Sequence, residues 1–153
     1  MYQFSRFVIA GIQLPLHILP RNTRMGSALY REVLSKHLRH SMRKTGTKIF
    51  QQDGAPCHKS KMMMAWFKKQ GITLLDWPGQ SPDMNPIENL WTAFKRILYK
   101  RFKPPRNLAQ LEFNMRRAWK LLGKDKELLF NLCDSMERRI DRLVEVEGGH
   151  TKY

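Results

Sequence analysis

Cysteine is scarce in this chain, and long apolar runs are missing from it. The two cysteines, Cys57 and Cys133, lack the C-x-x-C spacing of common zinc sites and are too few for a disulfide framework. No apolar run approaches the ~18 residues of a membrane-crossing helix, and the sequence shows no signal peptide. These absences favour a protein of a reducing compartment that has neither a structural zinc site nor a membrane helix.

Acidic residues are also in short supply. The chain has 13 Asp and Glu against 28 Lys and Arg, which gives a net charge of +15 and a pI of about 10.3. Such a charge is unusual for an enzyme of small metabolites and typical of a protein that binds nucleic-acid phosphates. A structural RNA-binding protein is one interpretation of this charge. The length of 153 residues suits a single domain with one core.

Two of the few acids stand at the ends of a distinctive stretch. Asp53 follows a β-prone run over residues 48–52, and the Gly-Ala-Pro tripeptide after it ends the strand. Glu88 falls in the first turn of a predicted helix, because the preceding Asn-Pro pair supplies a cap and a favoured first residue. The two acids are separated by 34 residues. One acid therefore ends a strand, and the other begins a helix.

Between the two acids, the pattern predicts a helix over residues 59–69 and a short strand over residues 72–75. This is a β-α-β crossover, which brings strand ends to one edge of a sheet, so the next helix can return Glu88 towards Asp53. Two carboxylates at such an edge suit Mg²⁺ and phosphoryl transfer. Two simpler interpretations stay open, in which Asp53 is a turn residue and Glu88 is the partner of its helix cap.

Three segments in order closely resemble the catalytic domain of Tc/mariner superfamily transposases, namely QQDGAPCH, LLDWPGQSPDMNPIENLW and the terminal GGHTKY. The resemblance extends over nearly the whole chain, residues 8–153, and the 34-residue spacing is typical of the Tc branch. It implies an α/β fold of ribonuclease-H-like type, with a mixed sheet flanked by helices and a helical C-terminal part. It also implies metal-dependent DNA cleavage and strand transfer. In that mechanism Asp53 and Glu88 correspond to the second and third acids of an Asp-Asp-Glu site that binds Mg²⁺ or Mn²⁺.

The first acid of that site has no counterpart in these residues. No aspartate precedes Asp53, and the only earlier acid, Glu32, falls on the predicted solvent face of a helix over residues 25–38. The resemblance therefore predicts an N-terminally truncated domain that lacks its first catalytic strand and part of its metal-ligand set. We expect the isolated chain to be inactive or nearly so, which leaves its status as an enzyme open. A non-catalytic DNA-binding protein derived from a transposable element is the alternative.

Basic side chains near the acids are candidates for DNA contact. His58 lies five residues after Asp53, at the mouth of the expected site, where it can contact a phosphate or orient a ligand. The segment 95–106, KRILYKRFKPPR, has six basic residues and no acid, which suits phosphate binding and a nuclear localisation signal. The simpler interpretation of this segment is an exposed helix end before a Pro-Pro break. The six candidates are Lys95, Arg96, Lys100, Arg101, Lys103 and Arg106.

The rest of the sequence predicts strands over residues 7–12 and 14–19, a basic loop over 39–48, and two helices over 107–122 and 126–146. The inner stripe of the first of these helices is predicted to be Leu108, Leu111, Met115, Ala118, Trp119 and Leu122. That of the second is predicted to be Leu129, Leu132, Met136, Ile140 and Leu143, with Arg116, Arg117, Arg138, Arg139 and Arg142 outside. We expect one partial ribonuclease-H-like domain over residues 1–147, a flexible tail over 148–153, nuclear localisation, and self-association through an exposed sheet edge.

Overall fold

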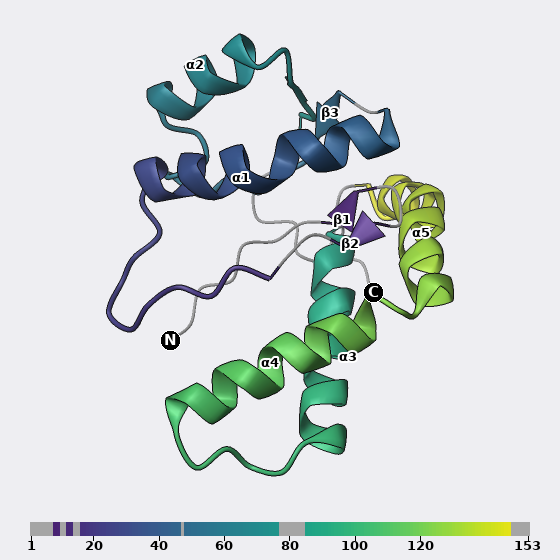
Figure 1. The fold of residues 1–153 in the computed structure, drawn as a ribbon. Helices are drawn as coiled ribbons and strands as arrows, with labels where there is room; N and C mark the ends of the chain where they lie inside the picture. Colours follow the sequence, from purple (N-terminus) through teal and green to yellow (C-terminus); the bar gives the residue numbers. More distant parts are fainter. Residues whose placement is uncertain (1–7, 10–11, 14–15, 47, 77–84, 148–153) are drawn as a thin grey trace. The chain divides into compact units, whose positions relative to one another are not determined.

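The computed structural model describes residues 8–9, 12–13, 16–46, 48–76 and 85–147, which contain five helices and two pairs of short strands (Figure 1). The chain divides into two compact units. The first unit comprises Met1–Ser5 and His17–Ser81, and the second comprises Arg6–Leu16 and Pro82–Tyr153. Asp53 belongs to the first unit and Glu88 to the second.

Helix α1 (Ser27–Thr45) carries the core of the first unit. Its buried stripe, in which no side chain is more than 3% exposed, consists of Tyr30, Val33, Leu34 and Leu38. The sequence predicts that this helix ends at residue 38 and that a loop follows, and both predictions are wrong. The helix continues because Ser41 and Met42 are also buried and extend the same stripe. It ends at Gly46, whose φ of 70° lies in the left-handed region that favours glycine.

The predicted β-α-β crossover is confirmed in the first unit. Strand β3 (Ile49–Phe50) pairs in parallel with β4 (Thr73–Leu74), and helix α2 (Lys61–Lys69) connects them. Ser60 caps α2, because its side chain accepts a hydrogen bond from the amide of Met63. The ring of Phe67 on α2 packs against Phe50 on β3 with 5.8 Å between ring centroids. Both strands are shorter than predicted, so Asp53 lies three residues beyond the end of β3.

The predicted strands near the N-terminus are only partly correct. Strands β1 (Val8–Ile9) and β2 (Ile12–Gln13) pair antiparallel; β1 falls within the first predicted strand, and β2 begins at its last residue. Gln13, where the prediction requires a connection, is instead a strand residue that pairs with Val8. In the second predicted strand, the described residues include one isolated bridge, at Ile18. The described strands thus form two separate pairs, and the expected single mixed sheet is not seen among them.

In the second unit, which also contains the β1–β2 pair, α3 (Pro86–Arg101) packs against α4 (Leu108–Leu122) and α5 (Lys126–Glu145) (Figure 1). Asn85 and Asn107 cap α3 and α4, as the sequence predicts. The ring of Trp91 on α3 lies 5.4 Å from that of Trp119 on α4, and the ring of Phe94 lies 5.5 Å from the same Trp119 ring. These aromatic contacts hold α3 against α4. The predicted inner stripe of α4 is confirmed at Met115, Ala118, Trp119 and Leu122, whereas Leu111 is half-buried and Leu108 is 51% exposed.

Helix α5 has a different inner face from the one predicted. Its buried residues are Leu129, Leu132, Ser135 and Arg139. Arg139 is only 2% exposed, although the sequence predicts it outside, and Ile140, predicted inside, is 50% exposed. The other four arginines predicted to lie outside are exposed. The helix is therefore rotated relative to the prediction, because hydrogen bonds to the Arg139 guanidinium compensate for its burial.

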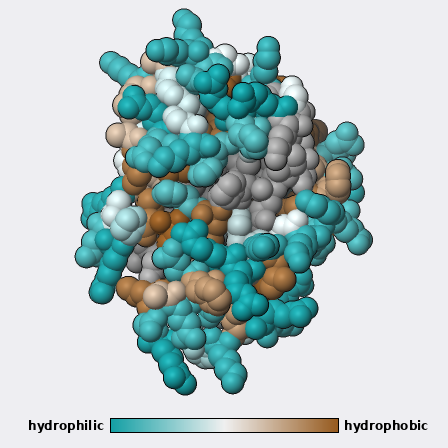
Figure 2. All heavy atoms as spheres, viewed as in Figure 1, coloured by the Kyte–Doolittle hydropathy of each residue, from teal (hydrophilic) through white to brown (hydrophobic). Residues whose placement is uncertain are grey.

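The surface agrees with the basic composition. Figure 2 shows one face of the molecule, and hydrophilic residues cover most of its coloured part, with smaller hydrophobic areas between them. Among the described residues, no helix is long and apolar enough to cross a membrane. The predicted tail, residues 148–153, lies outside the described residues.

Candidate functional site

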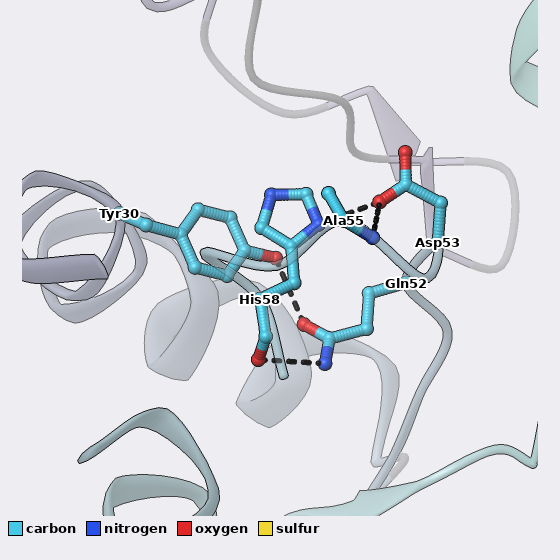
Figure 3. A network of polar contacts seen from close by, with 5 residues as sticks. All are labelled: Tyr30, Gln52, Asp53, Ala55 and His58. Carbon is cyan, nitrogen blue, oxygen red and sulfur yellow. Dashed lines mark hydrogen bonds and ion pairs between the residues drawn. The ribbon is translucent and has the colours of Figure 1, made fainter. Parts of the chain in front are cut away.

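Asp53 lies in the loop that follows β3, and its carboxylate is held from two sides (Figure 3). Asp53 Oδ1 accepts a hydrogen bond from the backbone amide of Ala55 at 3.2 Å and contacts His58 Nδ1 at 2.6 Å. The side chain of Asp53 is 34% exposed and that of His58 is 17% exposed. In Figure 3 the second carboxylate oxygen points away from both of these contacts. The loop thus fixes the orientation of the carboxylate while solvent still reaches it.

Tyr30 on α1 supports the other end of this loop. Its ring stacks on His58 with 4.0 Å between centroids and an interplanar angle of 28°. The hydroxyl of Tyr30 donates a hydrogen bond to Gln52 Oε1 at 3.1 Å, and Gln52 Nε2 donates to the carbonyl oxygen of His58 at 3.3 Å. Figure 3 shows the His58 ring between Tyr30 and Asp53, with the Gln52 side chain linked to both Tyr30 and His58. Helix α1 therefore positions the His58 ring, which in turn holds the carboxylate of Asp53.

Sequence reasoning did not find Tyr30 or Gln52 as parts of the site. Position 30 falls in the buried stripe of α1, where an aromatic residue has the same pattern as any core residue. Gln52 belongs to a polar pair at the end of a predicted strand. The one available signal was that the Tyr hydroxyl, once buried, requires a hydrogen-bond partner.

Burial controls the protonation of two neighbours of Asp53. Desolvation, followed by the negative charge of Asp53, strongly raises the pKa of Tyr30, so its hydroxyl stays protonated and remains a donor. Desolvation is also the main cause of the raised pKa of Cys57, to which Asp53 contributes. Burial therefore favours the protonated thiol at Cys57.

Glu88 lies in the first turn of α3, as predicted, and is half-buried. Asn85 Oδ1 accepts a hydrogen bond from the amide of Ile87 at 3.3 Å, which begins the helix immediately before Glu88. One residue further on, Asn89 Oδ1 accepts a hydrogen bond from Arg139 Nη2 on α5 at 2.9 Å. Arg139 Nε also donates to Ser135 Oγ at 2.9 Å. The first turn of α3 is thus fixed by its own cap and by the buried guanidinium of α5.

The structure brings His58 to Asp53 but does not test the expected meeting of Asp53 and Glu88, because these acids belong to different units. Among the described residues, no group of three or more His, Cys, Asp or Glu forms a metal-binding cluster. Glu32 is exposed and pairs with Lys36 at 2.6 Å. The hydrogen bond from Lys36 lowers the pKa of Glu32. Glu32 therefore faces solvent, as the sequence predicts.

The basic residues of the segment after Glu88 are all exposed, whereas its apolar residues Ile97, Leu98 and Phe102 are half-buried. None of its six basic side chains forms an ion pair with another residue in the part of the chain that the structure describes. The six exposed residues are Lys95, Arg96, Lys100, Arg101, Lys103 and Arg106. Their positive charge is consequently available to an anionic partner.

Comparison with known proteins gives consistent matches. Residues 20–112 match the family model described as DDE superfamily endonuclease. The chain is 40% identical over 136 residues to the Tc3 transposase of Caenorhabditis elegans, covering 86% of this chain and 40% of that protein. It is 34% identical over 131 residues to the Tcb2 transposase of Caenorhabditis briggsae, covering 84% of this chain and 46% of that protein. The chain thus spans less than half the length of these curated relatives.

Two solved structures share the fold. The catalytic domain of Mos1 mariner transposase superposes with a TM-score of 0.77 at 14% identity, covering 99% of this chain and 82% of that one. The same catalytic domain with raltegravir and Mg gives a TM-score of 0.74 at 17% identity, covering 90% of this chain and 70% of that one. At these identities the likeness is one of fold, and it agrees with the predicted ribonuclease-H-like type.

Proposed function

The chain belongs to the Tc1/mariner family of transposases and carries residues of its DDE catalytic domain, and from this premise we propose that Asp53 and Glu88 serve metal-dependent DNA cleavage and strand transfer. The observation that supports this most directly is the position of Asp53. Its carboxylate is oriented by His58 and the Ala55 amide, and it is still partly exposed. Metal-ligating carboxylates are typically held by such hydrogen bonds.

The residues fit a hard divalent cation. Mg²⁺ and Mn²⁺ prefer oxygen ligands, and both proposed ligands are carboxylates on well-defined local structure. Structures of the Mos1 catalytic domain with Mg and with Mn make these the cations to test. When bound, such an ion would activate the attacking oxygen and stabilise the leaving oxygen at phosphorus.

The chain's own residues have separate roles in this proposal. Asp53 and Glu88 provide the anionic oxygens. His58 holds Asp53 Oδ1, so that the other carboxylate oxygen is aimed in a fixed direction. Tyr30 supports the His58 ring by stacking, and its raised pKa keeps its hydroxyl bonded to Gln52.

Residues 1–153 supply only two of the three acids that the family site uses. No aspartate precedes Asp53, and Glu32 is exposed and forms an ion pair with Lys36. We therefore propose that these residues alone cleave DNA slowly or not at all.

The six exposed basic residues after Glu88 are proposed to bind DNA phosphates, and they also form the proposed nuclear localisation signal. A second candidate function rests on this observation. In it, residues 1–153 bind DNA without catalysing, through the exposed basic segment, and Asp53 and Glu88 have no catalytic role.

Calorimetric titration with Mn²⁺ tests the metal proposal. Asp53→Asn and Glu88→Gln should each weaken Mn²⁺ binding by at least about tenfold, a range that loss of an oriented ligand can produce. Glu112→Gln is the matched control, since Glu112 lies on α4 in an exposed pair with Arg116. Unchanged Mn²⁺ affinity in both site variants would show that the proposed metal site is wrong. DNA binding that persists in both variants, with no cleavage even when the missing acid is restored, would favour the non-catalytic function.

A further inference from the structure

The outer face of α3 joins Glu88 to the basic segment. Glu88, Thr92, Lys95 and Tyr99 follow one another at steps of four, three and four residues, so they share one face of the helix. We name these four residues the α3 outer face. The opposite face, which contains Ile87, Leu90 and Phe94, is buried. Because the buried face fixes the rotation of α3, the outer face is directed away from the core of the second unit.

The α3 outer face has the length of a short DNA segment. At a rise of ~1.5 Å per residue, Lys95 lies ~10 Å and Tyr99 ~16 Å from Glu88 along the helix axis. One strand of duplex DNA advances ~3.4 Å per nucleotide, so this distance corresponds to up to about five nucleotides. A strand that has one phosphate at Glu88 can therefore extend along the helix as far as Tyr99.

The charge of this face suits a polyanion. No acid occurs between Glu88 and Arg106. Lys95 lies on the face itself, and Arg96 and Lys100 flank it, all of them exposed. Acidic protein partners are an alternative source of negative charge, but they do not explain the aromatic residue in the middle of these cations.

Tyr99 is the residue that indicates the kind of nucleic acid. It is 77% exposed, the largest value among the exposed large hydrophobic residues of the described part of the chain. An exposed aromatic ring among cations is the usual arrangement of a base-stacking surface, worth ~1–3 kcal/mol per base. Bases in a duplex already stack on one another and do not present their faces to such a ring.

We propose that the α3 outer face binds an unpaired DNA strand, with Lys95 at a phosphate and Tyr99 stacked on a nucleobase. Only the direction of the strand, which starts at Glu88, rests on the proposed metal function. The strand-binding surface itself stands on the exposure, charge and helical spacing of its residues. In this proposal Tyr99 binds DNA in addition to the basic side chains.

Fluorescence anisotropy in EDTA, with a labelled oligothymidine and a duplex of equal length, tests this proposal. Tyr99→Ala should weaken oligothymidine binding about tenfold, which corresponds to ~1.4 kcal/mol, and should leave duplex binding within about twofold. Tyr99→Phe keeps the ring and should bind like the unaltered chain. Lys95→Gln should reduce the dependence of log K on log salt for the single strand by about 0.7.

Phe130→Ala is the matched control, because Phe130 is an exposed aromatic residue (57%) on a different helix, α5. The proposal is overturned if Tyr99→Ala binds oligothymidine normally, if it weakens duplex and single strand equally, or if Phe130→Ala has the same effect. Because metal is absent, the outcome does not depend on the Mn²⁺ titration. Normal Mn²⁺ affinity of both Asp53→Asn and Glu88→Gln, together with a specific Tyr99 effect, would refute the metal site and retain the strand-binding surface.

Discussion

Replacement of Arg139 by Met should destabilise the second unit strongly, although the side chain is basic and was predicted to lie on the surface. Arg139 is 2% exposed, and its guanidinium donates to Ser135 Oγ and Asn89 Oδ1, each at 2.9 Å. Hydrogen bonds that involve a charged group are worth about 1.5–3 kcal/mol each. Met has a similar length and fills most of the space, so the main cost is that Asn89 and Ser135 lose their donor.

The expected loss in unfolding free energy is about 2–4 kcal/mol, within the range for removal of a buried hydrogen-bonding partner. For a chain of this length each kcal/mol shifts the melting temperature by about 2–4 °C, so a decrease of about 5–15 °C is expected. Urea unfolding followed by circular dichroism measures the free energy directly. Arg142→Met is the control, because Arg142 forms an exposed pair with Glu145 on the same helix and should change stability by less than about 0.5 kcal/mol.

A double-mutant cycle with Asn89→Ala identifies the contact responsible. If the hydrogen bond between Arg139 and Asn89 carries much of the effect, the double variant should lose less unfolding free energy than the two single variants added together. The expected difference is at least about 1 kcal/mol. Strict additivity, or an Arg139→Met variant as stable as the unaltered chain, would refute the reasoning that the guanidinium connects α5 to the first turn of α3.

Three further outcomes are expected. Tyr30→Phe should lower the unfolding free energy by about 1 kcal/mol in urea titration, because the hydrogen bond to Gln52 is lost while the stacking on His58 is kept, and a loss above about 3 kcal/mol would contradict this. The pKa of Tyr30 is raised in the folded chain above its ordinary value of 10.0, so the stability it contributes is present below pH 10 and is lost above it. Denaturant titrations at several pH values should show this fall, and it should be smaller in Tyr30→Phe. Ile49 and Leu75, at the β3–β4 pair, are 56% and 43% exposed, so we expect the chain to self-associate as its concentration rises. Sedimentation experiments should show this association and its reduction by Ile49→Thr, and a strictly monomeric chain would refute it.

Local signals explain which parts of the fold were predictable. The cap of α3 was predicted because Asn85 and Pro86 are strong signals for a helix start. The crossover was predicted because an amphipathic helix lies between two short β-prone runs, and such runs pair in parallel with a helix between them. His58 was predicted to lie at the mouth of the site because it follows Asp53 by only five residues, but its direct contact with the Asp53 carboxylate was not specified.

The failures occurred where burial involves polar residues. The stripe of α1 continues through Ser41, which donates to the carbonyl oxygen of His37, and a pattern of apolar residues alone ends before it. On α5, apolar residues occupy two faces, so Ile140 competed with Arg139 for the inner position. Arg139 takes the inner position because Asn89 on α3 accepts a hydrogen bond from it. The periodicity of one helix contains no information about a partner on another helix.

The support of the Asp53 loop by α1 has a consequence for substitution tolerance. Val33 and Leu34 need only fill volume, so other aliphatic side chains can replace them at modest cost. Position 30 must supply a flat ring for His58 and a hydroxyl for Gln52 at the same time. Phenylalanine meets one of these demands and leucine meets neither. A saturation library of α1 should therefore accept a narrower set of residues at position 30 than at its buried neighbours, even though it lies outside every segment that resembles the catalytic motifs.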